Sequence, residues 1–303
     1  TTFTDAAASE FREKARAVLL KEGKTELAAE MGSAAIGTVH SVCQRFVRKF
    51  WYDLGLSPEM NVMSEDDRKF YINQSIADVV SEEDLNFFEE FTRDFEVSRF
   101  EDNASNIDFD FWKRYIEQVI SAMAAYDVKD LKESAERSKG IVSELFYSEE
   151  PDCNILNELK TTFSAWAPTN RRYRNPDAKV AEMNTAIRGA SSFAGALKLR
   201  NHVNDTITNT FLKGNPNFAI DLLNSTLTKL ITSKKHGEKI CQCIDRIFKI
   251  AGEWKKGYED YKKEHHLLDF DDMEQYFLRL LTESQYEEQR KEIATYRLVM
   301  VDE

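Results

Sequence analysis

Apolar residues follow two different spacings along the chain, and each spacing predicts one kind of secondary structure. A continuous apolar run, Leu298-Val299-Met300-Val301, predicts a β-strand covered on both faces, as in a parallel sheet flanked by helices. Shorter strands are expected at residues 1–3 and 36–39, because each of these segments runs directly into a predicted helix. The chain therefore has at least one α/β part.

Apolar residues at three-to-four spacing predict helices over most of the remaining chain. In the helix expected at residues 41–54, one face carries Val42, Phe46, Phe50, Trp51 and Leu54. In a helix that begins at the acidic residues 269–272, the apolar face carries Phe270, Met273, Phe277, Leu280 and Leu281. Further helices are predicted at residues 5–20, 111–126, 141–146, 218–231 and 240–261. We expect a mainly helical protein.

Length and composition indicate a globular chain of about two domains. The 303 residues are 42% hydrophobic, which is enough for sizeable cores. We expect an α/β domain formed by residues 1–60 and 266–303, interrupted by an all-helical insertion at residues 61–265. No apolar run of membrane-spanning length and no signal peptide is present, which argues against a membrane partner. Four scattered cysteines predict free thiols in a reducing compartment, and hence a cytoplasmic location.

Charge is distributed unevenly. Net charge is −12, where a simple duplex-binding domain would be basic. Residues 64–111 contain 15 acidic and 4 basic side chains, whereas residues 160–213 contain 9 basic and 3 acidic ones. The basic stretch includes Arg171, Arg172 and Arg174, with Tyr173 between them as a possible stacking group. These arginines are candidate DNA phosphate contacts, and a solvated loop with no partner is the alternative.

Two adjacent carboxylates, Asp302 and Glu303, follow the last predicted strand. Ligands of parallel sheets bind just beyond the carboxyl ends of the strands. There, an Asp can hold Mg²⁺ and a neighbouring Glu can orient and deprotonate an attacking water, which is the chemistry of nucleotide hydrolysis. The alternative is a plain strand followed by a solvated turn.

The two other predicted strands both lead into helices that begin with hydroxyl residues. Thr4 and Ser41 stand near those helix starts, where unpaired backbone N–H groups suit a phosphate. The rings of Phe3 and His40 could stack on bases. In the structural alternative Thr4 and Ser41 only cap the helices and Phe3 belongs to the core.

Four segments, in order, resemble motifs of superfamily 1 UvrD/Rep-type DNA helicases. Residues 2–12 resemble motif Ia, usually written T-F-T-N-x-A-A-x-E-M-x-x-R, and residues 38–43 resemble motif Ib, T-[IF]-H-S-[FM]-C. Residues 268–273 are similar to the L-D-F-D-D-[LM] stretch before the Walker B strand, and Val301-Asp302-Glu303 match the start of motif II. The continuation after motif Ib looks most like the RecB/AddA branch, the helicase-nuclease subunits that process broken DNA ends.

This resemblance implies a partial RecA-like P-loop NTPase domain with a parallel sheet, into which a large all-helical, 1B-like insertion is placed. It implies that ATP and Mg²⁺ are cofactors, that Asp302 holds the metal, and that Glu303 activates water. By the same resemblance Phe3, Thr4, Thr38 and His40 contact single-stranded DNA. The implied partners are single-stranded DNA, DNA ends and a second helicase-nuclease subunit. The three predicted strands are then expected to be parallel neighbours in one sheet.

Departures from the family pattern limit this expectation. Asp5 stands where the family commonly has Asn, and a carboxylate there would repel DNA phosphate. Gly23-Lys24-Thr25 imitates the end of a phosphate-binding loop, but Val18 replaces its first glycine, so a helix end and loop are predicted. We expect a fragment of a larger enzyme that is inactive alone, because the Walker A loop and motifs III to VI are missing. The alternatives are a UvrD/Rep-like repair helicase without a nuclease and a non-enzymatic helical scaffold.

Overall fold

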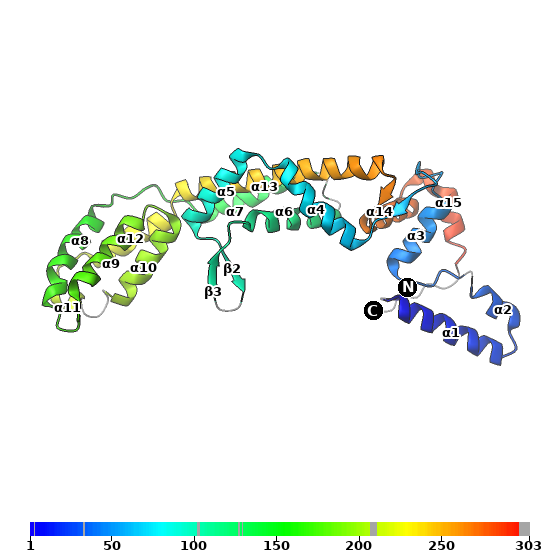
Figure 1. Cartoon of the computed structure of the whole chain (residues 1–303), viewed down its shortest axis with the longest axis horizontal. Coiled ribbons are helices and arrows are strands. Elements are labelled where there is room, and N and C mark those ends of the chain that lie inside the picture. The colour runs from blue at the N-terminus through cyan, green and yellow to red at the C-terminus, as the bar shows by residue number, and fades with distance from the viewer. Residues whose placement is uncertain are drawn as a thin grey trace. The chain divides into compact units, whose positions relative to one another are not determined.

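A computed structural model describes residues 1–2, 4–32, 34–101, 104–126, 128, 130–206 and 211–296 (Figure 1). The chain packs into two compact units, Thr1–Ser75 with Lys256–Glu303, and Ile76–Lys255. The first unit therefore contains both ends of the sequence, and the second unit is inserted between them. Phe3, the predicted strand at residues 298–301, Asp302 and Glu303 lie outside the described residues.

The first unit consists of helices and a small parallel strand pair. Its elements are α1 (Asp5–Lys21), α2 (Thr25–Glu30), α3 (Val39–Lys49), β1 (Asn61–Val62), most of α4 (Glu65–Val79), the end of α13 (Lys234–Glu264), β4 (Leu267–Leu268), α14 (Phe270–Thr282), η3 (Ser284–Tyr286) and α15 (Glu287–Ile293). Strands β1 and β4 are parallel, with Asn61 opposite Leu267. Strand β1 precedes α4, in which the chain leaves for the second unit, and β4 follows α13, in which it returns. Sequence patterns did not predict this contact.

The strands predicted at residues 1–3 and 36–39 are represented by one parallel bridge between Thr2 and Thr38. Their predicted adjacency is therefore confirmed. The predicted strand length at residues 36–39 is wrong, because α3 begins at Val39. The helix predicted at residues 5–20 is confirmed as α1, and Gly23 follows it with φ +74°, as expected for a helix end and loop.

Helix α3 packs against α14 to form the core of the first unit. The rings of Phe46 and Phe277 stack with their centroids 5.2 Å apart. Around them the buried side chains are Cys43, Val47, Phe50, Leu54, Leu268, Met273, Leu280 and Tyr286. Most of both predicted apolar faces lies in this core, but Trp51 and Leu281 are not among its residues. Helix α3 ends at Lys49, so Phe50 and Leu54 lie in the turns that follow it.

In its described residues the second unit is mainly helical, with one β-hairpin and one isolated bridge between Ser148 and Ser233. Its helices are α5 (Glu82–Phe95), α6 (Phe111–Ala125), α7 (Leu131–Leu145), α8 (Asn154–Trp166), η1 (Ala167–Thr169), α9 (Pro176–Gly189), α10 (Phe193–Thr206), α11 (Leu212–Gly214), α12 (Ile220–Ile231) and most of α13. Strands β2 (Ser98–Glu101) and β3 (Ala104–Ile107) form an antiparallel hairpin. The prediction of an all-helical insertion missed this hairpin, because its short, polar strands lack a clear apolar alternation.

Helices α8, α9, α10 and α12 lie together in the second unit (Figure 1). Their buried side chains form one apolar core. Its largest fully buried side chains include Phe163, Met183, Leu199, Phe211 and Leu223. A second packing region joins α5 to α6, where the ring of Phe88 stacks on Trp112 at 5.5 Å and 8°. The two regions are connected, because the rings of Phe95 in α5 and Phe193 in α10 stack with their centroids 5.1 Å apart.

Candidate nucleic-acid interface

The N-termini of α1 and α3 are joined by the bridge between Thr2 and Thr38. The backbone N–H of Thr2 donates to the carbonyl of Gly37 at 2.9 Å. Thr4 caps α1, since its Oγ1 accepts from the N–H of Ala7 at 3.2 Å. Thr38 caps α3 in the same way, accepting from the N–H of Ser41 at 3.3 Å. Two helix N-termini, whose first N–H groups lack intrahelical partners, therefore begin close to one bridge.

Thr38, and not Ser41, is the cap of α3. The hydroxyl of Ser41 donates back to the carbonyl of Thr38 at 2.9 Å, so Ser41 is a first-turn residue. The alternative in which Ser41 caps this helix is wrong, and the corresponding expectation for Thr4 is confirmed. Capping does not exclude a DNA contact, because an N-cap hydroxyl stays at the exposed end of its helix.

His40 lies on the first turn of α3 and contacts α14. Its ring centroid is 4.7 Å from that of Phe270, with the planes at 47°. Its Nε2 lies 3.2 Å from Oε1 of Glu274. Even so, 47% of the His40 side chain is exposed. The imidazole is thus held on one side by α14 while part of it remains open to a ligand.

Two arginines that sequence patterns did not single out hold the segment before Thr38. Nη2 of Arg12 donates to the carbonyl of Ile36 at 2.6 Å, and Nη1 of Arg45 donates to that of Ala34 at 2.9 Å. Both line a groove of about 410 Å³ between α1 and α3. Arg12 lies within the motif Ia segment, but at a position that the pattern leaves unspecified. Arg45 stands in no motif, so the motif patterns could have found neither arginine.

Gly37 allows this segment to pass close to α3. A Cβ added at Gly37 would lie 2.1 Å from Oγ of Ser41, well inside contact distance. The backbone φ of Gly37 is not in the left-handed region, so the requirement is for space. Only glycine lets the Thr2 bridge and the Thr38 cap form side by side without displacing Ser41.

Acidic residues at the start of α14 surround a buried lysine. Asp269 is the N-cap and forms a capping box with Asp272: each side chain accepts from the other's backbone N–H, at 2.9 and 3.0 Å. Nζ of Lys262 donates to Asp272 at 2.8 Å and to Asp269 at 3.2 Å. The structural interpretation of these acids is therefore supported by specific contacts.

The pKa values in this cluster are shifted in opposite directions. Burial, and then the charge of Asp269, raise the pKa of Asp272 to about 6. Burial alone would also raise the pKa of Asp269, but Lys262, the N–H of Asp272 and the Tyr258 hydroxyl outweigh it and lower that pKa. Burial lowers the pKa of Lys262, but the nearby carboxylates dominate and raise it, so the lysine stays charged.

Arg171, Arg172 and Arg174 lie in the exposed turn between η1 and α9. Tyr173 is half-buried, and its ring packs edge-on against Trp166 at 5.8 Å. Its predicted stacking on bases is not favoured, because the ring already contributes to the core of the α8 to α12 bundle. The three arginines around it are the part of this turn that stays open to a phosphate.

Three of the four other histidines have local partners. Nδ1 of His265 lies 3.0 Å from the carbonyl of Tyr261, and His202 lies 4.0 Å from Glu182. His236 is buried between Phe95 and Phe193, and burial lowers its pKa. All four cysteines are free thiols, as predicted. Within the described residues, no three His, Cys, Asp or Glu side chains gather in a way that could hold a metal ion.

The predicted ATP and Mg²⁺ site cannot be compared with this geometry, because Asp302 and Glu303 lie outside the described residues. The chemistry of the pair fits the group, since Mg²⁺ prefers hard oxygen ligands such as carboxylates. Among the described residues, no helix combines the length and the apolar character needed to span a membrane.

Comparison with known protein families finds one whose model matches the whole chain. The chain belongs to the UvrD/REP helicase N-terminal domain family, which it matches over residues 1–303.

Among curated relatives, the chain is similar to proteins named as subunits of an ATP-dependent helicase/nuclease. The protein of Ligilactobacillus salivarius (strain UCC118) is 21% identical over 335 residues, covering 92% of this chain and 26% of the relative. That of Pelotomaculum thermopropionicum is 42% identical over 72 residues, covering 21% of this chain and 6% of the relative. That of Heliobacterium modesticaldum is 38% identical over 89 residues, covering 27% and 6%. The chain thus spans about a quarter or less of these relatives.

Proposed function

We propose that this chain is part of an ATP-dependent DNA helicase and exonuclease, which translocates on single-stranded DNA while broken DNA ends are processed. The observation that carries the proposal is the family match over the whole chain. Its support in the structure is the Thr2 to Thr38 bridge, which joins the two helix starts that carry motifs Ia and Ib. The helicase/nuclease names of the relatives favour this function over a repair helicase without a nuclease and over a helical scaffold.

In this proposal the strand-contacting surface of the first unit consists of Phe3, Thr4, Thr38 and His40. The two threonines stand at helix N-termini, where unpaired N–H groups favour phosphate. The exposed part of the His40 ring supplies a stacking surface. Arg12 and Arg45 hold the segment that leads to Thr38.

The nucleotide-dependent part of the proposal rests on the last two residues. Asp302 would hold Mg²⁺ and Glu303 would orient and deprotonate water. Bound ATP would supply the phosphoryl group whose transfer to water drives movement along the strand. A second helicase-nuclease subunit, DNA ends as substrate and a cytoplasmic location complete the proposal.

Salt dependence separates the two kinds of DNA contact. In the full-length protein, changing Arg171, Arg172 and Arg174 to Ala should weaken DNA binding equally for all sequences. It should also reduce the slope of log affinity against log salt by up to about three units, if each arginine meets a phosphate. His40→Ala should instead lower affinity, by about 1–3 kcal/mol per stacked base, with a nearly unchanged slope. Fluorescence anisotropy of a labelled oligonucleotide measures both quantities.

A matched control removes the same charge elsewhere. Arg93, Arg137 and Lys291 are exposed and ion-paired with glutamates in their own helices, so changing all three to Ala alters net charge equally. That variant should leave the salt slope close to wild type. If the Arg171, Arg172 and Arg174 variant behaves like this control, these arginines form a solvated loop. If His40→Ala also binds normally, the proposed DNA surface is wrong.

A further inference from the structure

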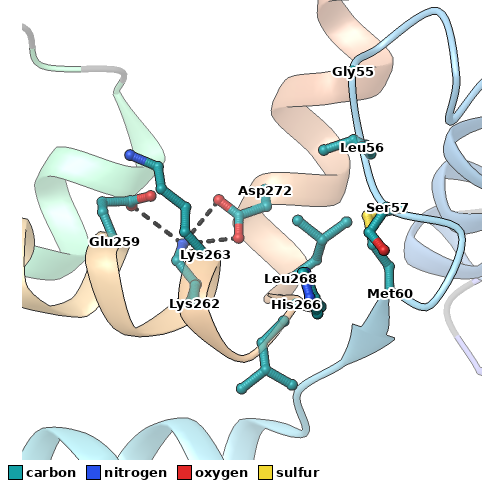
Figure 2. Close-up of a pocket in the computed structure, with 11 residues that line it drawn as sticks. Gly55, Leu56, Ser57, Met60, Glu259, Lys262, Lys263, His266, Leu268 and Asp272 are labelled. Carbon is teal, nitrogen blue, oxygen red and sulfur yellow. Dashed lines mark hydrogen bonds and ion pairs between the residues drawn. The ribbon is translucent and has the colours of Figure 1, made fainter.

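The ammonium of Lys262 is enclosed by carboxylates at the junction of α13 and α14 (Figure 2). Only 5% of the Lys262 side chain is exposed. Besides Asp269 and Asp272 it contacts Oε1 of Glu259 at 3.2 Å. The hydroxyl of Tyr258, one helical turn before, donates to Asp269 at 2.9 Å. A buried lysine with three acidic neighbours needs an explanation, because burying charge is costly.

The contacts of Lys262 define the geometry of one helix start. Asp269 and Asp272 form the capping box of α14, so these two partners of the lysine also accept from the backbone of that helix. Lys262 belongs to the last turn of α13, the long helix that returns from the second unit. The ammonium thus ties the end of α13 to the first turn of α14.

The same first turns of α14 hold His40. Phe270 follows the cap directly and contacts the His40 ring, while Glu274 lies two residues after Asp272 and meets its Nε2. An altered capping box would therefore move both groups that orient the imidazole. We propose that Lys262 is a positioning residue for single-stranded DNA binding, which acts by fixing the start of α14 and through it His40. This inference rests on the proposed function.

Lys262 cannot act as a phosphate contact itself, since its side chain is nearly fully buried and its donors are used. Without its charge, two buried carboxylates face each other uncompensated, and like charges at this distance repel. The capping box then opens or takes up a proton. Arg68 holds α14 separately, through Asp271 at 2.9 Å, so loss of Lys262 should shift the helix start without detaching the helix.

A double-mutant cycle in the full-length protein tests this role. Lys262→Met should weaken binding of a labelled single-stranded oligonucleotide by about 5-fold or more. The loss should not exceed that of His40→Ala, because the variant acts only by displacing the His40 ring that stacks on a base. In the His40→Ala background the same change should have little further effect, since the two residues act on one contact. The salt slope should stay close to wild type, whereas losing a phosphate contact would reduce it by roughly 0.7 to 0.9.

Two further variants keep the test decisive. Lys263→Met removes the same charge from the exposed neighbouring position and should bind normally. If Lys262→Met does not fold, Asp272→Asn provides a milder change. Its amide oxygen can still accept from the backbone N–H of Asp269, whereas the ion pair between Lys262 and Asp272 is lost. Additive effects in the cycle, or normal binding by both Lys262→Met and Asp272→Asn, would overturn the inference.

A readout that needs no DNA separates this inference from the proposed function. Nuclear Overhauser contacts between the ring protons of His40 and Phe270 should be present in the wild type and weakened in Lys262→Met. If they are weakened while His40→Ala binds DNA normally, Lys262 positions His40 but the proposed DNA surface is wrong. If they persist unchanged in Lys262→Met, Lys262 does not position His40.

Discussion

Replacing Arg246 with Met should destabilise α5 by about 3 kcal/mol, because it removes the cation from a buried carboxylate. Asp84 is only 2% exposed, and its carboxylate accepts from Arg246 and, at 2.6 Å, from the hydroxyl of the helix cap Ser81. Burial alone would raise the pKa of Asp84, but Ser81 and Arg246 outweigh it and lower that pKa. The buried carboxylate therefore depends on partners from two helices.

The magnitude follows from the exposure of each partner. Breaking a buried ion pair by removing one partner costs about 3–5 kcal/mol. The lower end applies here, since 26% of the Arg246 side chain is exposed and water can reach Asp84 once it is gone. The second contact, to Glu83 at 2.8 Å, adds at most about 1 kcal/mol, because Glu83 is 81% exposed. Methionine retains apolar contact with the Phe87 ring, which the guanidinium covers at 4.7 Å.

Hydrogen exchange of the α5 amides, read by mass spectrometry, measures the local opening free energy directly. Glu83→Gln is the control and should change it by less than about 1 kcal/mol. Asp84→Asn combined with Arg246→Met should recover part of the loss, because no buried charge remains unpaired. If Arg246→Met lowers the local opening free energy of α5 by less than about 1 kcal/mol, the reasoning is refuted, because a loss that small is typical of an exposed ion pair.

Two further predictions concern the first unit. Asp272 has an ordinary pKa of 3.8 when unfolded and about 6 when folded, so the folded protein binds more protons between these values. Its contribution therefore makes stability fall as pH rises from about 4 to 6. Urea unfolding from about pH 4 to 6 measures the free energy of unfolding of wild type and of Asp272→Asn. The difference, wild type minus variant, should fall as pH rises, and a rise would contradict the raised pKa of Asp272. Gly37→Ala should cost about 1–3 kcal/mol through its clash with Ser41, measured by thermal unfolding. Adding Ser41→Ala should restore part of it, and no rescue would locate the strain elsewhere.

Sequence patterns predict that a helix exists more reliably than they predict the residues at which it begins and ends. The apolar faces around Phe46 and Phe277 repeat at helical spacing, so both helices and their contact could be expected. The start of α3 was misplaced because Thr38 and Ser41 are both good caps, and only the backbone of the bridge to Thr2 decides between them. The β2 and β3 hairpin was missed because local pattern does not encode its pairing.

In the candidate site, too, the sequence predicts some contacts and not others. The motif resemblance places Thr4 and Thr38 at neighbouring helix starts, and the bridge between Thr2 and Thr38 supports this. The contact of His40 with α14 joins residues more than 200 positions apart, so no local signal could reveal it. Likewise, in the sequence Lys262 resembles an ordinary exposed lysine near the end of a helix. Only the fold shows that it is buried against Asp269 and Asp272.

The most direct test is DNA-stimulated ATP hydrolysis by the full-length protein that contains this chain. Glu303→Gln keeps the shape of the side chain and removes its basicity, so turnover should fall by roughly 10²-fold or more while nucleotide binding persists. Asp302→Asn should instead weaken the response to Mg²⁺. Near-normal turnover in Glu303→Gln would contradict the assignment of a helicase catalytic strand to the end of this chain.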